Sequence, residues 1–186
     1  IRDRMIQLQA LNLKEVKINR YDGGMQNEAQ LWVNASPEDE IPNSAFNSKT
    51  SLLRLVLKKK KKKIGENAFF GCNNLVGSLV IPEGVLHIGS YAFMSCSSLS
   101  GIISLPSTLI HIGNNAFDNC KFNSELNLPN NLKYIGNAAF NWNSSLYGTL
   151  NLPSSLEYIG SHAFAGCKNL TGSLEIPEKI TEIKEY

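Results

Sequence analysis

Four cysteines are the side chains best suited to hold a metal ion or to form disulfides. They are Cys72, Cys96, Cys120 and Cys167. Their intervals of 24, 24 and 47 residues contain no Cys-x-x-Cys pair of the kind that zinc sites use. All four share one phase of a recurring interval, and Asn143 takes that phase where a cysteine is missing. We therefore expect a column of buried thiols that pack as small apolar groups, because the parallel Cβ directions of such a column suit disulfides poorly.

Three histidines, His87, His111 and His162, are the candidates for acid–base chemistry. No serine or cysteine nucleophile accompanies them at a motif spacing. The chain also lacks the G-x-S-x-G, H-E-x-x-H, Walker A and G-x-G-x-x-G motifs. An extracellular hydrolase would need a catalytic pair that this sequence does not display. The sequence therefore predicts that the protein is not an enzyme, with no catalytic, metal-binding or cofactor-binding residues and no cofactor.

The composition is that of an ordinary folded protein. The chain has 186 residues, of which 42% are hydrophobic and 18% charged, and this balance excludes global disorder. No run of 18 apolar residues exists, so no transmembrane segment is expected, and the first ten residues lack the apolar core of a signal peptide. The absence of an initial Met suggests a mature form or an excised fragment.

The net charge of +2 depends on one lysine run. Six of the 18 basic residues lie from Lys58 to Lys63, which leaves 12 basic against 16 acidic residues elsewhere, a net charge of −4. The rest of the chain carries no general basic field, so we expect no nucleic-acid partner.

One short unit recurs along most of the chain. An Ile-Gly dipeptide returns every 23 or 24 residues, beginning at Ile64, Ile88, Ile112, Ile135 and Ile159. Ala-Phe follows each glycine three residues later, with the rings at Phe69, Phe93, Phe117, Phe140 and Phe164. A proline keeps the same phase at Pro82, Pro106, Pro129, Pro153 and Pro177. A unit this short cannot bury its own apolar face, so about six copies must stack into a solenoid with one continuous core.

The apolar positions predict how each unit folds. Residues three and one before each proline are apolar, as in Leu79 and Ile81, and this period of two predicts a strand. Residues three and six after proline, such as Val85 and Ile88, are also apolar and are expected to point inward. The short Ala-Phe segment is flanked by polar residues, so we expect one helical or 3₁₀ turn there, and the phenylalanines should stack as a buried column. The glycine after isoleucine suits a tight corner.

The repeats, for example LVIPEGVLHIGSYAFMSCSSLSG and LNLPSSLEYIGSHAFAGCKNLTG, resemble the BspA-like leucine-rich repeats. The resemblance covers residues 41–186. It implies an α/β repeat solenoid of the right-handed leucine-rich-repeat type, with parallel strands and short helical or 3₁₀ turns in about six 23–24-residue repeats. It also implies exposure at the cell surface and binding of host proteins or other cells.

Residues 1–40 depart from this pattern. Leu8-x-x-Leu11-x-Leu13 has a generic leucine-rich spacing, Asp22-Gly23-Gly24 predicts a turn, and Leu31-Trp32-Val33 predicts a short strand. Open solenoids need an atypical end unit to cover the apolar core. We therefore expect a capping region over residues 1–40 and the leucine-rich repeat domain over residues 41–186, whose last repeat is incomplete and is expected to continue in a longer protein.

The position five residues after proline gives the first candidate binding surface. It holds His87, His111, Tyr134 and Tyr158, here called the aromatic stripe. Its neighbours at +3 and +6 point inward, so the stripe is expected to be at least partly exposed, where His and Tyr supply contact area. The alternative is that these rings only fill a half-buried corner.

Outward strand positions give a second candidate surface. Val56, Val80 and Ile102, here called the apolar patch, are expected to lie together on the exposed sheet face, with Val80 and Ile102 as its main contacts. Exposed apolar patches on a solenoid can mark a partner site, although single surface valines in strands are ordinary.

Three further features remain open at this level. The lysine run places Lys58 at a proline phase and Lys61 at a core phase. The run is therefore a basic loop for glycans or nucleic acid, a solvated irregularity, or not the genuine sequence.

Asn143-Ser144-Ser145 and Asn169-Leu170-Thr171 fit the N-glycosylation pattern, and both are expected in exposed loops. Trp142 replaces the small residue of other copies and is either a packing substitute or a contact point.

Together these observations predict a non-catalytic binding or adhesion module of a cell-surface or secreted protein. The expected partner is an extracellular protein or glycan, such as a host or matrix component. The alternative is a rigid structural spacer that presents another domain of a larger surface protein.

Overall fold

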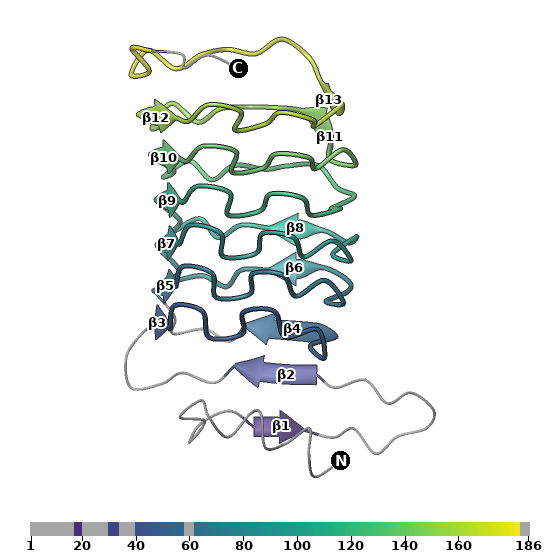
Figure 1. Ribbon diagram of the computed structural model, residues 1–186. Helices are drawn as coiled ribbons and strands as arrows, with labels where there is room; N and C mark the ends of the chain where they lie inside the picture. Colours follow the sequence, from purple (N-terminus) through teal and green to yellow (C-terminus); the bar gives the residue numbers. More distant parts are fainter. Residues whose placement is uncertain (1–16, 20–29, 34–39, 58–61, 183–186) are drawn as a thin grey trace.

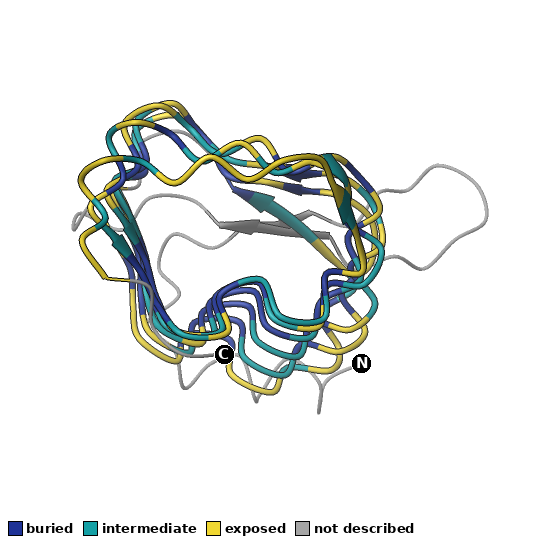
Figure 2. Cartoon of the chain, turned by 90° about the horizontal axis from the view of Figure 1, so that it is seen from above, coloured by how far each residue is buried: buried dark blue, intermediate teal, exposed yellow. Residues whose placement is uncertain are grey.

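The computed structural model describes residues 17–19, 30–33, 40–57 and 62–182. Within these ranges the chain forms rungs that stack one above another (Figure 1). Viewed from above, successive rungs overlie one another in a common outline, with buried residues concentrated toward its inner side (Figure 2). The prediction of a repeat solenoid with a shared core is confirmed. The expected features of Leu8 to Leu13, Asp22 to Gly24 and Lys58 to Lys61 lie outside the described residues.

The largest sheet has six parallel strands, one from each rung. They are β3 (Glu40–Ile41), β5 (Lys63–Ile64), β7 (His87–Ile88), β9 (His111–Ile112), β10 (Tyr134–Ile135) and β12 (Tyr158–Ile159). The strands lie in the order β12-β10-β9-β7-β5-β3, in register, so equivalent residues of successive rungs face each other. Sequence reasoning placed the isoleucines inward but did not identify these strands, because two residues are too few to show a period of two.

The predicted strand before each proline forms in only part of the chain. β6 (Leu79–Val80) and β8 (Ile103–Ser104) pair in parallel there, with Leu79 and Ile103 buried. In later rungs the parallel pairing lies a few residues further from the proline, through β11 (Tyr147–Thr149) and β13 (Asn169–Thr171). The segments directly before Pro129 and Pro153, residues 126–128 and 150–152, form no strand.

A three-stranded sheet lies at the N-terminal end of the described ranges. β4 (Arg54–Leu57) pairs in parallel with β2 (Gln30–Val33), and β2 pairs antiparallel with β1 (Lys17–Asn19). The predicted strand at Leu31 to Val33 is confirmed, since it lies within β2.

The Ala-Phe segment is a series of turns, so the expected helical or 3₁₀ turn is not found among the described residues. In one rung the N–H groups of Ala68 and Phe70 bond to carbonyls three residues earlier. The alternate N–H groups, those of Asn67 and Phe69, bond instead to Ser90 and Ala92 of the next rung. A helix would need all of these donors within the segment, so hydrogen bonding between rungs replaces it. Asn67 accordingly has a left-handed φ of 53°.

The core is a set of columns that run through the rungs. The predicted phenylalanine column is present and includes Phe46 as well, with neighbouring ring centroids 5.0 to 5.6 Å apart and nearly parallel rings. The members before Phe164 are buried, and Phe164 is partly buried. Buried leucine and isoleucine side chains pack beside this column.

The last described rung is less packed than its sequence predicts. Leu174 and Ile176 occupy inward phases, yet they are 48% and 41% exposed. No strand forms at 173–178 in the described chain, so backbone pairing does not hold these side chains against the core.

Candidate functional site

The aromatic stripe is a continuous row of rings on the outer side of the six-stranded sheet, stacked from His111 to Tyr158. Each member opens a strand, from β7 to β12, and the parallel register brings neighbours face to face. The ring centroids of His111 and Tyr134, and of Tyr134 and Tyr158, are 4.5 Å apart, with the planes within 6° of parallel. His87 lies 5.9 Å from His111 at a 47° tilt. His87 is exposed and the other three are half-buried, so each ring keeps an accessible part.

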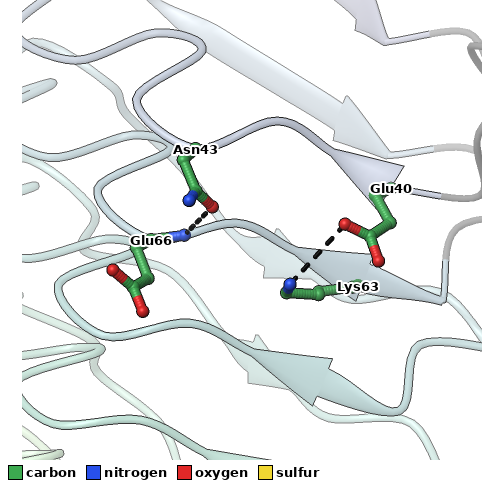
Figure 3. Close-up of polar contacts among 4 residues, drawn as sticks. All are labelled: Glu40, Asn43, Lys63 and Glu66. Atoms are coloured by element: carbon green, nitrogen blue, oxygen red, sulfur yellow. Dashed lines mark hydrogen bonds and ion pairs between the residues drawn. The ribbon is translucent and has the colours of Figure 1, made fainter.

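The same column continues into charged residues that sequence reasoning did not include. Lys63 pairs in register with His87, and Glu40 pairs with Lys63. The Lys63 ammonium lies 3.6 Å from a carboxylate oxygen of Glu40 (Figure 3). Both residues hold the phase of the stripe, and that phase was the signal that could have found them. The exposed side of the sheet thus changes from an ion pair at β3 and β5 to aromatic rings from β7 onward.

Asparagines support the turns beside this column. Asn43 Oδ1 accepts a hydrogen bond from the backbone N–H of Glu66 at 2.9 Å (Figure 3). Asn114 Oδ1 accepts from Asn137 N–H at 2.8 Å in the same way, three rungs further along. These bonds link each turn to the next rung and keep the strand starts in register.

Packing within the stripe changes its titration. Burial lowers the pKa of His111 below its usual 6.5, and the nearby His87 imidazole lowers it further. Burial also raises the pKa of Tyr134, with a smaller contribution from Tyr158. At neutral pH these rings are therefore uncharged, which suits contact with an apolar or aromatic partner surface.

The apolar patch is partly assembled. Val80 and Ile102 are each 58% exposed and lie on neighbouring segments, with Val80 paired to Ser104 and Ile102 N–H bonded to Ser78 Oγ at 3.0 Å. The two side chains are thus offset diagonally across the pair rather than directly opposite. Val56 is half-buried in β4 and contributes less surface. The role of both surfaces in binding stays a prediction.

The cysteine phase forms a buried column of free thiols, as predicted. Each Sγ donates to a phenylalanine carbonyl of the preceding rung, as Cys96 does to Phe69 at 3.2 Å. Burial raises the pKa of Cys72 and Cys167 to about 11, so the thiols stay protonated and unreactive at neutral pH.

Asn143 takes the cysteine position in its rung and is fully buried, which corrects the expectation that it lies in an exposed loop. Its amide points into the core because the turn geometry of every rung directs this phase inward. An N-linked sugar at Asn143 is incompatible with this burial, whereas Asn169 of the second acceptor segment is exposed in β13.

A groove opens between the turns of two neighbouring rungs, beside Trp142. Its volume is about 550 Å³, and its lining includes Asn137, Asn141, Ser161 and Lys168. Trp142 is 57% exposed, so it is not a packing substitute for the small residue of other rungs. Sequence reasoning singled out Trp142 but could not find the groove, since its two sides lie about one repeat apart.

Within the described ranges, no group of three or more His, Cys, Asp or Glu side chains could hold a metal ion. No helix in those ranges has the length and apolar character needed to cross a bilayer.

Comparison with protein families matches residues 39–171 to the BspA type leucine-rich repeat region, in six copies. The chain belongs to the BspA-type leucine-rich repeat family. The comparison with curated proteins gives no match.

Three solved structures resemble this BspA-type chain. A leucine-rich repeat protein of T. pallidum is 27% identical, with a TM-score of 0.66, over 89% of this chain and 82% of that one. A leucine-rich repeat protein from Bacteroides ovatus is 24% identical, with a TM-score of 0.61, over 90% of this chain and 53% of that one. A leucine-rich cell surface protein from Faecalibacterium prausnitzii is 20% identical, with a TM-score of 0.57, over 86% and 52%. The chain thus spans about half the length of the last two, which support the fold alone.

Proposed function

We propose that this chain is a non-catalytic recognition module of a cell-surface or secreted protein, and that it binds an extracellular protein through the aromatic stripe. The observation that carries the proposal is the row of four accessible rings on one side of the solenoid, three of them stacked. Stacked Tyr and His rings offer large contact area with little side-chain entropy to lose, which is typical of residues that dominate protein interfaces. A contribution to adhesion would follow from such binding.

The chemistry of the stripe favours recognition over packing alone. The inward isoleucine of each strand already fills the core, as Ile112 and Ile135 do at 0% exposure. The rings that precede them add little to that burial, because His111, Tyr134 and Tyr158 keep accessible surface. The ion pair of Lys63 and Glu40 at one end supplies a polar border, which suits the rim of an interface.

Surface exposure is part of the proposal and is what the family resemblance implies. One of the similar structures is a leucine-rich cell surface protein. We also propose that residues 1–40 are an N-terminal cap on the repeat domain. The antiparallel pairing of β1 with β2 supports this, because it breaks the parallel series at that end.

A rigid spacer is the second candidate. The unbroken phenylalanine column, with parallel rings from Phe46 to Phe164, favours stiffness along the solenoid axis. A spacer and a recognition module differ in what happens when the stripe is changed, because only the module loses binding.

The test is the double substitution Tyr134→Ser with Tyr158→Ser, measured for binding to immobilised extracellular-matrix proteins and for melting temperature. We expect binding to fall at least tenfold while the melting temperature changes by only a few degrees. A matched control is Tyr91→Ser, which removes another exposed tyrosine outside the stripe. If the wild-type chain shows no saturable binding to any matrix protein, the recognition proposal is wrong and the spacer is favoured. If the double variant loses stability but binds normally when folded, the stripe is packing.

A further inference from the structure

Trp142 is a large, exposed side chain at a turn position that has a left-handed φ in the other rungs as well. Its φ is 55°, a left-handed value that a bulky side chain adopts only at an energetic cost. Gly71 and Gly166 hold this position in other rungs, and Ser95 does so with a φ of 61°. The indole is 57% exposed, so burial does not offset the cost. A strained and exposed aromatic residue points to a role in binding.

The neighbouring rung leaves space beside the indole. Gly166 lies next to Trp142, and a Cβ there would come within 3.2 Å of the Trp142 Cα and 3.3 Å of its Cε3. Any larger residue would press against the ring from this side. With glycine, the edge of the indole forms one wall of the groove between the two turns.

The surface of the groove is mostly apolar, and two asparagine side chains add polar atoms to it. Asn137 Oδ1 accepts the Ser161 N–H at 3.0 Å, and Asn141 Nδ2 donates to Asp118 Oδ1 at 3.2 Å. These bonds hold the two amides in place. In the described part of the chain, no hydrogen bond engages Asn137 Nδ2 or Asn141 Oδ1, so one donor and one acceptor remain for a ligand.

Charge adds a third requirement on the ligand. Lys168 lines the groove and is exposed, while no Asp or Glu belongs to the lining. An ammonium without a carboxylate beside it in the lining attracts an anionic group. The volume of about 550 Å³ lies within the range of sites that bind small molecules.

We propose that this groove is a subsite for a pyranose sugar that carries a carboxylate. The C–H face of the ring stacks on Trp142, hydroxyl groups exchange hydrogen bonds with Asn137 and Asn141, and the carboxylate pairs with Lys168. The subsite rests on the proposed recognition role for its biological context. It extends that role to a second surface, formed by the turns that follow β10 and β12. Two sources share this chemistry, namely uronic acids of matrix polysaccharides and sialic acids of glycoproteins.

The experiment titrates the protein with methyl glucuronide, a methyl sialoside and the uncharged methyl glucoside, and follows indole resonances and fluorescence. The chain has two tryptophans, Trp32 and Trp142, so Trp142→Ser assigns the signal. We expect at least one of the two acidic sugars to bind at least tenfold more tightly than the glucoside, and the tighter of the two identifies the source. Trp142→Ser should abolish binding, and Lys168→Gln should remove the preference for the acid. The proposal is overturned if neither acidic sugar binds, if the glucoside binds equally well, or if Trp142→Ser still binds.

Controls separate a lost site from a lost fold. Trp142→Ser should melt no lower than wild type, because Ser48 and Ser95 already adopt this left-handed position. Tyr91→Asn removes another exposed aromatic with positive φ and should leave sugar binding unchanged. The Tyr134→Ser and Tyr158→Ser double variant should also keep it. Sugar binding without matrix-protein binding would overturn only the stripe proposal, and the reverse result would overturn only the subsite.

Discussion

Asn143 carries a buried polar atom that its neighbours in the thiol column do not have. Its Nδ2 reproduces the thiol bond of the other rungs, donating to the Phe117 carbonyl at 2.7 Å and also to Phe140 at 3.0 Å. Its Oδ1 is buried without a hydrogen-bond partner among the described residues. A buried acceptor without a partner loses its hydration and gains nothing in return, which costs about 1–3 kcal/mol.

We predict that Asn143→Cys stabilises the protein. The thiol would donate to the Phe117 carbonyl as the other cysteines donate in their rungs, and the unpaired Oδ1 would be gone. The free energy of unfolding should rise by about 1 kcal/mol, measured by urea denaturation. The reciprocal change Cys120→Asn should lower it, because it places a second amide in the column. Equal or lower stability of Asn143→Cys would show that the amide bonds outweigh the orphaned oxygen.

His111 makes the stability of the fold depend on pH. Its pKa is lowered below 6.5 in the folded chain by burial and by His87, so the unfolded chain binds a proton more readily. Neutral His111 therefore contributes its full stability above about pH 6.5. The free energy of unfolding falls as the pH drops from there toward the pKa of the folded chain. The variant His111→Tyr continues the tyrosines of the stripe. Its melting temperature should fall less between pH 7.5 and 5.0 than that of the wild type. An identical loss in both proteins would assign the pH dependence to other groups.

At the scale of the elements, rungs approach each other most closely at the glycine that follows each inward isoleucine. A Cβ at Gly113 would lie 2.5 Å from the backbone nitrogen of Ser90 and 2.7 Å from the carbonyl carbon of Gly89. The glycine N–H also bonds to the carbonyl of Ile88 in the preceding rung, at 2.8 Å. Close approach between strands, rather than a positive φ, therefore requires glycine at this position.

Gly113→Ala is predicted to destabilise the solenoid by about 3 kcal/mol, because backbone atoms of the adjacent rung cannot move aside without breaking pairing. Gly77→Ala is the matched comparison. Gly77 has a φ of +88° but nothing within 4 Å of its Cβ position, so strain alone should cost about 1–2 kcal/mol. Thermal unfolding of both variants distinguishes the two causes. Equal losses would mean that crowding between rungs contributes nothing measurable.

The sequence predicts the features that recur at the same position of every repeat. The phase of Phe117, Ile112 and Cys120 is visible because the same inward positions recur in every copy, and the stripe follows from the same phase. The turn at Asn67 could not be predicted, since its N–H bonds to Ser90, a residue of the next rung. The groove depends likewise on Gly166 lying beside Trp142 in space. Lys63 directly precedes Ile64, so its phase was visible, but the stripe was drawn only from the His and Tyr positions.

At the scale of the whole molecule, the solenoid behaves as a one-dimensional array. Each rung contacts only its neighbours, and the phenylalanine column is the contact that all rungs share. Phe117 lies in the middle of this column, 5.6 Å from Phe93 and 5.2 Å from Phe140 between ring centroids, and it also meets Phe122 edge to face at 6.2 Å. Removing its ring interrupts stacking on both sides.

Phe117→Ala is predicted to cost about 3–5 kcal/mol and to divide the unfolding of the chain. The interfaces that join the two halves of the solenoid lose the ring that they share. The rungs before and after residue 117 should therefore unfold in separate steps. Amide hydrogen exchange, measured at increasing denaturant concentration, would resolve these steps. Phe164→Ala provides the comparison, because Phe164 is partly buried and has a ring neighbour only on the Phe140 side within the described chain. That variant should lose protection in the last rungs while the earlier rungs keep theirs. A single coincident transition in Phe117→Ala, merely shifted to lower denaturant, would mean that cooperativity extends beyond neighbouring rungs, and the column would then act as one unit rather than as a chain of separable contacts.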